Sequence, residues 1–166
     1  MIKYAATRLL LRKLDRLYNE ADGADATLPI AYSKLATLEV CGWLEEAFDE
    51  IAHNSVRHKL RTFEKRKLLA EKIEKTHGFD YGSHARPLIA HAVGVVKLME
   101  VERKLESSAA LSRLKGNIGS LKILRRDAAH TSLAGRSTAY PAPSISMATF
   151  EDCLPVLQQF WKLVRS

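Results

Sequence analysis

An arginine pair and a histidine stand close together in the hexapeptide RRDAAH, residues 125–130. Imidazole can take up or release a proton near neutral pH, so histidine serves as a general acid or base. The guanidinium group of arginine presents a fixed fork of hydrogen-bond donors that matches a phosphate. Arg125, Arg126 and His130 therefore favour chemistry on a phosphodiester bond.

The hexapeptide lies at the end of a helix that apolar periodicity predicts over residues 111–130. Residues four apart share a helix face, as Arg126 and His130 would, whereas five residues correspond to about 140° of rotation. Three arrangements stay open: the helix bends near Asp127, Arg125 reaches round the helix, or Arg126 is the working arginine. Gly116 and Gly119 are expected to mark either a close helix approach or a break.

Composition indicates a soluble helical domain with an anionic partner. The 166 residues are 46% hydrophobic and 27% charged, with a formal net charge of +7, and nucleic acid is the commonest anionic partner of basic proteins. We expect a cytoplasmic protein, since neither a membrane-spanning apolar run nor the apolar centre of a signal peptide occurs. Cys41 and Cys153 form no Cys-x-x-Cys pair, so we expect no metal site, no cofactor and two core cysteines.

The remaining elements follow from the same periodicity and from glycine and proline positions. Helices are predicted over residues 2–20, 31–54, 56–77, 88–105, 111–130 and 149–164, with loops at 21–29, 78–87 and 134–148. The last helix is expected to have Pro155 in its first turn and Asp152 as its N-cap. No two segments are typical of paired strands. The sequence thus predicts one all-α domain over residues 1–166, a helical bundle with a long loop before the C-terminal helix.

The spacing Arg125-x-x-x-x-His130, preceded by Leu121 and Leu124 and ending in Ala-His-Thr at 129–131, resembles the signature of the HEPN superfamily. Members of that superfamily are all-helical and carry an arginine, four to six residues, and a histidine. In the second predicted helix the stretch LEVCGWLEEAFD, residues 38–49, is similar to the acidic-apolar helix of the RiboL-PSP branch.

The resemblance implies a metal-independent endoribonuclease whose two protomers form a composite cleft, hence a homodimer. Arg125 would neutralise the RNA phosphate, and His130 would act as general acid or base while the 2′-hydroxyl attacks, leaving a 2′,3′-cyclic phosphate. The implied setting is a toxin or anti-phage defence effector with a neutralising or activating partner protein. The chain departs from the usual pattern, because Arg126 follows Arg125 and the acidic Asp127 lies one place further on.

Supporting roles are open for several residues. The resemblance implies that Glu46 holds Arg125 or His130, although a simple interhelical ion pair is the alternative, and Thr131 follows the histidine directly. Trp43 is expected in the core or at a dimer interface.

The run Lys65, Arg66 and Lys67 would contact RNA only if it lies beside His130, and otherwise it is a solvated face. The competing functions are a non-catalytic HEPN-like module that dimerises or binds RNA or a nucleotide in a larger defence complex, and a helical adaptor in which Arg125 pairs with Glu46.

Overall fold

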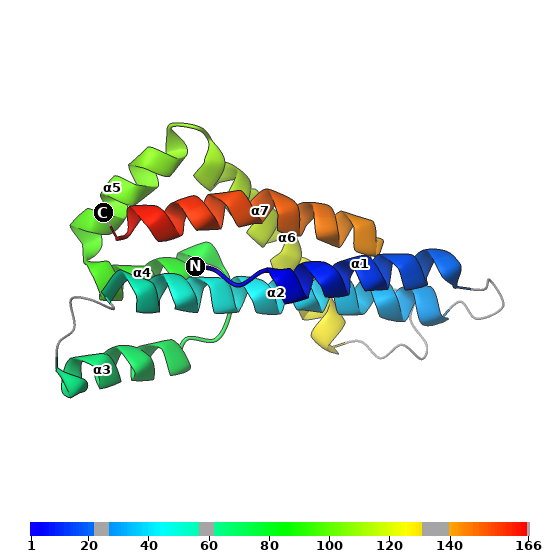
Figure 1. The fold of residues 1–166 in the computed structure, drawn as a ribbon, viewed down its shortest axis with the longest axis horizontal. Coiled ribbons are helices and arrows are strands. Elements are labelled where there is room, and N and C mark those ends of the chain that lie inside the picture. The colour runs from blue at the N-terminus through cyan, green and yellow to red at the C-terminus, as the bar shows by residue number, and fades with distance from the viewer. Residues whose placement is uncertain (22–26, 57–61, 131–139, 166) are drawn as a thin grey trace.

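The computed structural model describes residues 1–21, 27–56, 62–130 and 140–165, with Lys65 and His130 described by their backbone alone. Within these ranges the chain forms α-helices, one π-helical turn and no strand, which confirms the predicted all-α class (Figure 1). The elements are α1 (Ala5–Glu20), α2 (Thr27–Val56), α3 (Phe63–Glu74), the π-helical turn η1 (Tyr81–Ala85), α4 (Arg86–Val93), α5 (Val95–Glu106), α6 (Ala110–His130) and α7 (Pro143–Leu163).

The helix α2 is the centre of the bundle and packs against α1, α4, α6 and α7. Figure 1 shows α1 and α7 running along α2, while α6 crosses them and its C-terminal end emerges beyond α2. Apolar side chains cover a wide arc of α2 and are buried, among them Val40, Leu44, Phe48 and Ile51. A helix with so wide an apolar arc is stable only when neighbours cover it, which places α2 inside.

Two core predictions are confirmed. Trp43 is buried edge-on against Phe150, with ring centroids 4.4 Å apart, and its indole Nε1 donates to the Lys3 carbonyl at 2.8 Å. Cys41 and Cys153 are buried free thiols, and burial raises their pKa values to about 12 and about 11. Both thiols therefore stay protonated and act as small apolar residues.

The start of the last helix was predicted wrongly. The helix α7 begins at Pro143 rather than near residue 149, so Pro155 lies inside it and Asp152 is not its N-cap. Pro143 is the first helical residue, where the fixed φ of proline is already helical and no N–H is needed. Pro155 is exposed, so its ring projects away from the core at the point where one helical hydrogen bond is lost.

The other helix boundaries also differ from the prediction. The predicted helix over 88–105 is two helices, α4 and α5, because Gly94 adopts a φ of +87° that a glycine accepts readily. Pro87 stands in the first turn of α4 rather than in a loop, and Pro29 likewise lies in the first turn of α2. The helix predicted over 56–77 is shorter, since Val56 ends α2 and α3 spans Phe63–Glu74.

Gly116 and Gly119 mark neither a break nor a close approach. The helix α6 continues through both of them, and a Cβ added at either position would meet nothing within 4 Å. Both glycines lie on an exposed face of α6.

Candidate functional site

The C-terminal half of α6 and the segment from His77 to His84 enclose a cavity of about 430 Å³. The lining includes three cationic side chains and two imidazoles. The lining residues are His77, Gly78, Phe79, Asp80, His84, Lys122, Ile123, Arg125, Arg126 and Ala129. Both arginines of the hexapeptide therefore reach the same cavity. Arginine, lysine and histidine side chains of this kind are suited to binding a phosphate.

Arg125 is held by an acid of α2. Its Nη2 lies 3.0 Å from Glu45 Oε1, and its guanidinium carbon lies 5.9 Å from the centroid of the Phe79 ring. The Glu45 oxygen is buried and accepts no hydrogen bond of regular geometry from the described residues, so the contact is primarily a charge pair. Nearly half of the Arg125 side chain, 46%, is exposed. The guanidinium is thus oriented from one side and open on the other.

The acid on Arg125 is Glu45 and not Glu46, which is exposed. The register of α2 against α6 explains the difference. One turn before this pair, Cys41 Sγ donates to the Leu121 carbonyl at 3.9 Å. Positions 41 and 45 share one helix face, as do 121 and 125, so the two contacts are successive rungs of the same interface. Glu46 is rotated about 100° away from that face.

Arg126 is the more exposed arginine, with 72% of its side chain accessible, and its Nε lies 3.4 Å from Asp127 Oδ1. The helix α6 runs without interruption to His130, its last residue. The side chain of His130, and Thr131 altogether, lie outside the described residues. Ala129, the residue before His130, belongs to the cavity lining.

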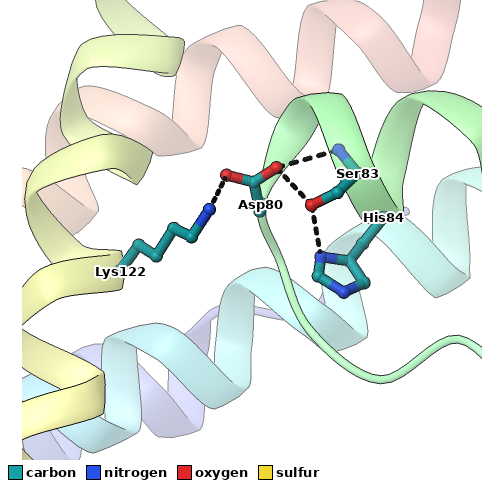
Figure 2. Close-up of polar contacts among 4 residues, drawn as sticks. All are labelled: Asp80, Ser83, His84 and Lys122. Atoms are coloured by element: carbon teal, nitrogen blue, oxygen red, sulfur yellow. Dashed lines mark hydrogen bonds and ion pairs between the residues drawn. The ribbon is translucent and has the colours of Figure 1, made fainter.

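Asp80, another residue of the cavity lining, contacts Lys122 of α6 and Ser83 of its own segment (Figure 2). Its Oδ1 accepts hydrogen bonds from the Ser83 amide at 2.8 Å and from the Ser83 hydroxyl, and its Oδ2 lies 3.0 Å from Lys122 Nζ. The two bonds from Ser83, followed by the one from Lys122, hold the pKa of Asp80 well below its usual range. Asp80 is therefore ionised and negatively charged near neutral pH.

The hydrogen bonds continue from Ser83 to His84, whose Nδ1 lies 3.1 Å from the Ser83 Oγ. The His84 ring rests on Gly78, where a Cβ would lie 3.1 to 3.3 Å from three ring atoms, and where φ is +120°. Glycine is thus required at 78 for both space and backbone conformation. Sequence reasoning did not select Ser83 or His84. The available signal was Asp80, three residues before Ser83 and shortly before a helix, which is the spacing of an N-cap.

A third acid, Asp49, lies on α2 one turn beyond Glu45. Burial, followed by the negative charges of Glu45 and Glu46, raises its pKa to about 6, and His77 opposes part of this shift. Glu45 thus places a negative charge beside Arg125, a residue of the cavity lining. Asp49 is an acid of α2 whose carboxyl protonates under mildly acidic conditions.

The basic run on α3 is separate from this cavity. Arg66 and Lys67 are exposed, and Lys67 Nζ lies 3.9 Å from Glu71 Oε1, one turn along the same helix. The described lining comes from the 77–84 segment and from α6, with no contribution from α3. The Lys65 side chain lies outside the described residues.

The described residues contain no group of three histidine, cysteine, aspartate or glutamate side chains placed to hold a metal ion. In the same part of the chain, no helix is long and apolar enough to cross a membrane. No known protein family, curated protein or solved structure matches the chain. The resemblance to HEPN proteins therefore stays a prediction.

Proposed function

We propose that this chain is a metal-independent endoribonuclease of HEPN type that holds an RNA phosphate in the cavity between α6 and residues 77–84. The observation that supports it most is the shared lining. Lys122, Arg125 and Arg126 line one cavity with two imidazoles, and the helix that carries the three cations ends at His130. A net charge of +7 adds a general attraction for polyanions.

Arg125 has the chemistry of a phosphate clamp. Its contact with Glu45 involves Nη2, so the guanidinium retains donors on two further nitrogens. The pairing holds the guanidinium at the cavity before substrate arrives, which reduces the reorganisation needed in the transition state. Arg126 and Lys122 add positive charge on the same side of the cavity.

The reaction is an internal transesterification. The ribose 2′-oxygen bonds to the adjacent phosphorus while the bond from phosphorus to the 5′-oxygen breaks, and His130 carries a proton in this exchange. The products are a 2′,3′-cyclic phosphate and a 5′-hydroxyl. DNA lacks the nucleophile, so the reaction is restricted to RNA.

The same proposal includes a homodimer with a composite cleft, and a cytoplasmic setting as a toxin or anti-phage effector with a neutralising or activating partner. This setting follows from the HEPN resemblance.

Variants test the proposal by cleavage of a mixed RNA pool in EDTA. We expect His130→Ala to lower the rate about 100-fold or more, the usual contribution of a general acid or base. Arg125→Ala should cost a similar factor through lost transition-state stabilisation. Arg103→Ala removes an equal charge from an exposed position on α5 and should cut at the wild-type rate. A His130→Ala variant as active as the wild type would overturn the proposal.

A second candidate is a non-catalytic HEPN-like module that binds RNA or a nucleotide. It is favoured by the Glu45 contact, because an arginine already paired with an acid has a structural use of its own. This candidate predicts no cutting by any variant, together with salt-dependent binding of single-stranded RNA that Arg126→Ala weakens. Binding that does not depend on salt would point instead to a helical adaptor.

A further inference from the structure

Asp80, Ser83 and His84 are joined by consecutive hydrogen bonds, and the donor of each bond can be assigned. Asp80 is ionised beside Lys122, so its oxygens accept only. The Ser83 hydroxyl therefore donates its single hydrogen to Asp80 Oδ1. Its oxygen is left to accept from His84 Nδ1, at 3.1 Å. Neutral His84 is consequently the Nδ1–H tautomer, and its Nε2 carries the lone pair.

His84 is also placed where that lone pair has a use. It is half-buried in the wall of the cavity that Arg125 and Arg126 line, and its ring is supported from below by Gly78. Support on one face and a hydrogen bond at Nδ1 restrict both ring rotations. A general base needs this combination of fixed orientation and an accepting nitrogen.

We propose that His84 is the general base of the ribonuclease reaction and that Ser83 and Asp80 are its positioning residues. The inference rests on the proposed function and deepens it, because it assigns the proton acceptor to a residue outside the hexapeptide. In the reaction, His84 Nε2 takes the proton of the 2′-hydroxyl as the new bond to phosphorus forms. The 5′-oxygen leaves with the electron pair of the broken bond and takes its proton from His130. The negative charge of Asp80, relayed through Ser83, stabilises the imidazolium until it releases its proton to solvent.

The charged and titratable groups around His84 come from two elements. Lys122, Arg125 and Arg126 face the cavity from α6, and His77 and Asp80 face it from the same segment as His84. A general base must be unprotonated to accept the 2′-hydroxyl proton, so the rate at saturating RNA should fall toward acidic pH.

The test compares His84→Ala with His91→Ala, because His91 is an exposed histidine of α4 outside the cavity lining, whereas His84 lines the cavity and contacts Ser83. We expect His84→Ala to lower the cutting rate about 100-fold while binding of 2′-O-methyl RNA changes less than about threefold. Added imidazole should restore part of the rate by occupying the space above Gly78. His91→Ala should leave the rate within about threefold of the wild type.

Positioning by Ser83 has its own readouts. Ser83→Ala should lower the rate about tenfold and move the acidic limb of the pH profile, whereas Ser83→Thr keeps the hydroxyl and should restore both. Nitrogen-15 NMR of the wild type reads the tautomer without any reaction, and we expect a protonated Nδ1 and an unprotonated Nε2 at His84.

The outcomes separate the two proposals. A wild type that cuts no RNA overturns the ribonuclease and the role of His84 together. A wild type that cuts, beside a His84→Ala variant that cuts equally well or that imidazole does not rescue, overturns the inference alone. An Nε2–H tautomer at His84 in the wild type would contradict the hydrogen-bond directions on which the inference depends.

Discussion

Replacing Asp80 by alanine should remove a helix cap and a cross-element ion pair at once. The Ser83 amide loses the acceptor that Asp80 Oδ1 provides at 2.8 Å, and loss of such a cap costs about 1 kcal/mol. The Ser83 hydroxyl bond adds about 0.5–1 kcal/mol. The ion pair with Lys122, whose side chain is 61% exposed, is screened by solvent and adds about 0.5 kcal/mol or less.

We therefore expect Asp80→Ala to lower the free energy of unfolding by about 2 kcal/mol at pH 7. For a domain of this size, about 1 kcal/mol corresponds to about 2–4 °C in melting temperature, so the expected loss is about 4–8 °C. Thermal unfolding followed by circular dichroism measures it. Asp152→Ala, at an exposed position on α7, is the matched control and should change the free energy by less than about 0.5 kcal/mol.

The low pKa of Asp80 determines how the stability difference between wild type and Asp80→Ala changes with pH. The pKa of Asp80 in the folded protein lies below its ordinary value of 3.8, so the charged form is the one that stabilises the fold. The contribution is fully present above the unfolded pKa and is lost as pH falls through the folded pKa. The difference between wild type and Asp80→Ala should thus be constant from pH 5 to 8 and shrink below about pH 4. An equal difference at pH 3 and pH 7, or a loss below about 0.5 kcal/mol at pH 7, would refute the assignment.

Three further changes have definite expected outcomes. Gly78→Ala, which forces φ = +120° on a side chain and a Cβ into the His84 ring, should lower the free energy of unfolding by about 1–3 kcal/mol in denaturant titration. Asp49→Asn should stabilise the fold by about 1 kcal/mol at pH 7–8, a figure discounted for solvent exposure, because a pKa raised to about 6 makes the charged form of Asp49 unfavourable in the fold. Below about pH 4, where Asp49 is protonated in the folded and unfolded states, this gain should vanish. A gain that persists there would contradict the raised pKa as its cause. Arg125→Ala and Glu45→Ala, combined in a double-mutant cycle, should show a coupling of about 0.5–1 kcal/mol, and strictly additive effects would show that the pair is energetically idle.

The order of helices could be predicted from the sequence, because apolar residues repeat at helical spacing almost throughout. Boundaries set by single residues could not be predicted as well. Proline is accepted both at the start of a helix and on its exposed face, so Pro143 and Pro155 were each compatible with the first turn of α7. Gly94 divides α4 from α5 through a positive φ that depends on how those two helices pack, which no local pattern contains.

Some features of the candidate site could likewise be predicted from the sequence, and others depend on the fold. The two arginines could be selected from residue types and spacing, and both do line the cavity. The acid on Arg125 depends on the rotation of α2 against α6, a tertiary property, which is why Glu45 and not Glu46 makes the contact. His84 lies about forty residues before Arg125, and only the fold brings its segment to α6.

The most direct test is cleavage of a mixed RNA pool by the wild-type protein in EDTA, followed by chemical analysis of the new 3′ ends. The proposed function predicts cutting that resists EDTA and ends that carry a 2′,3′-cyclic phosphate. RNA that stays intact, cutting that EDTA abolishes, or new ends that carry a 3′-hydroxyl would each contradict it.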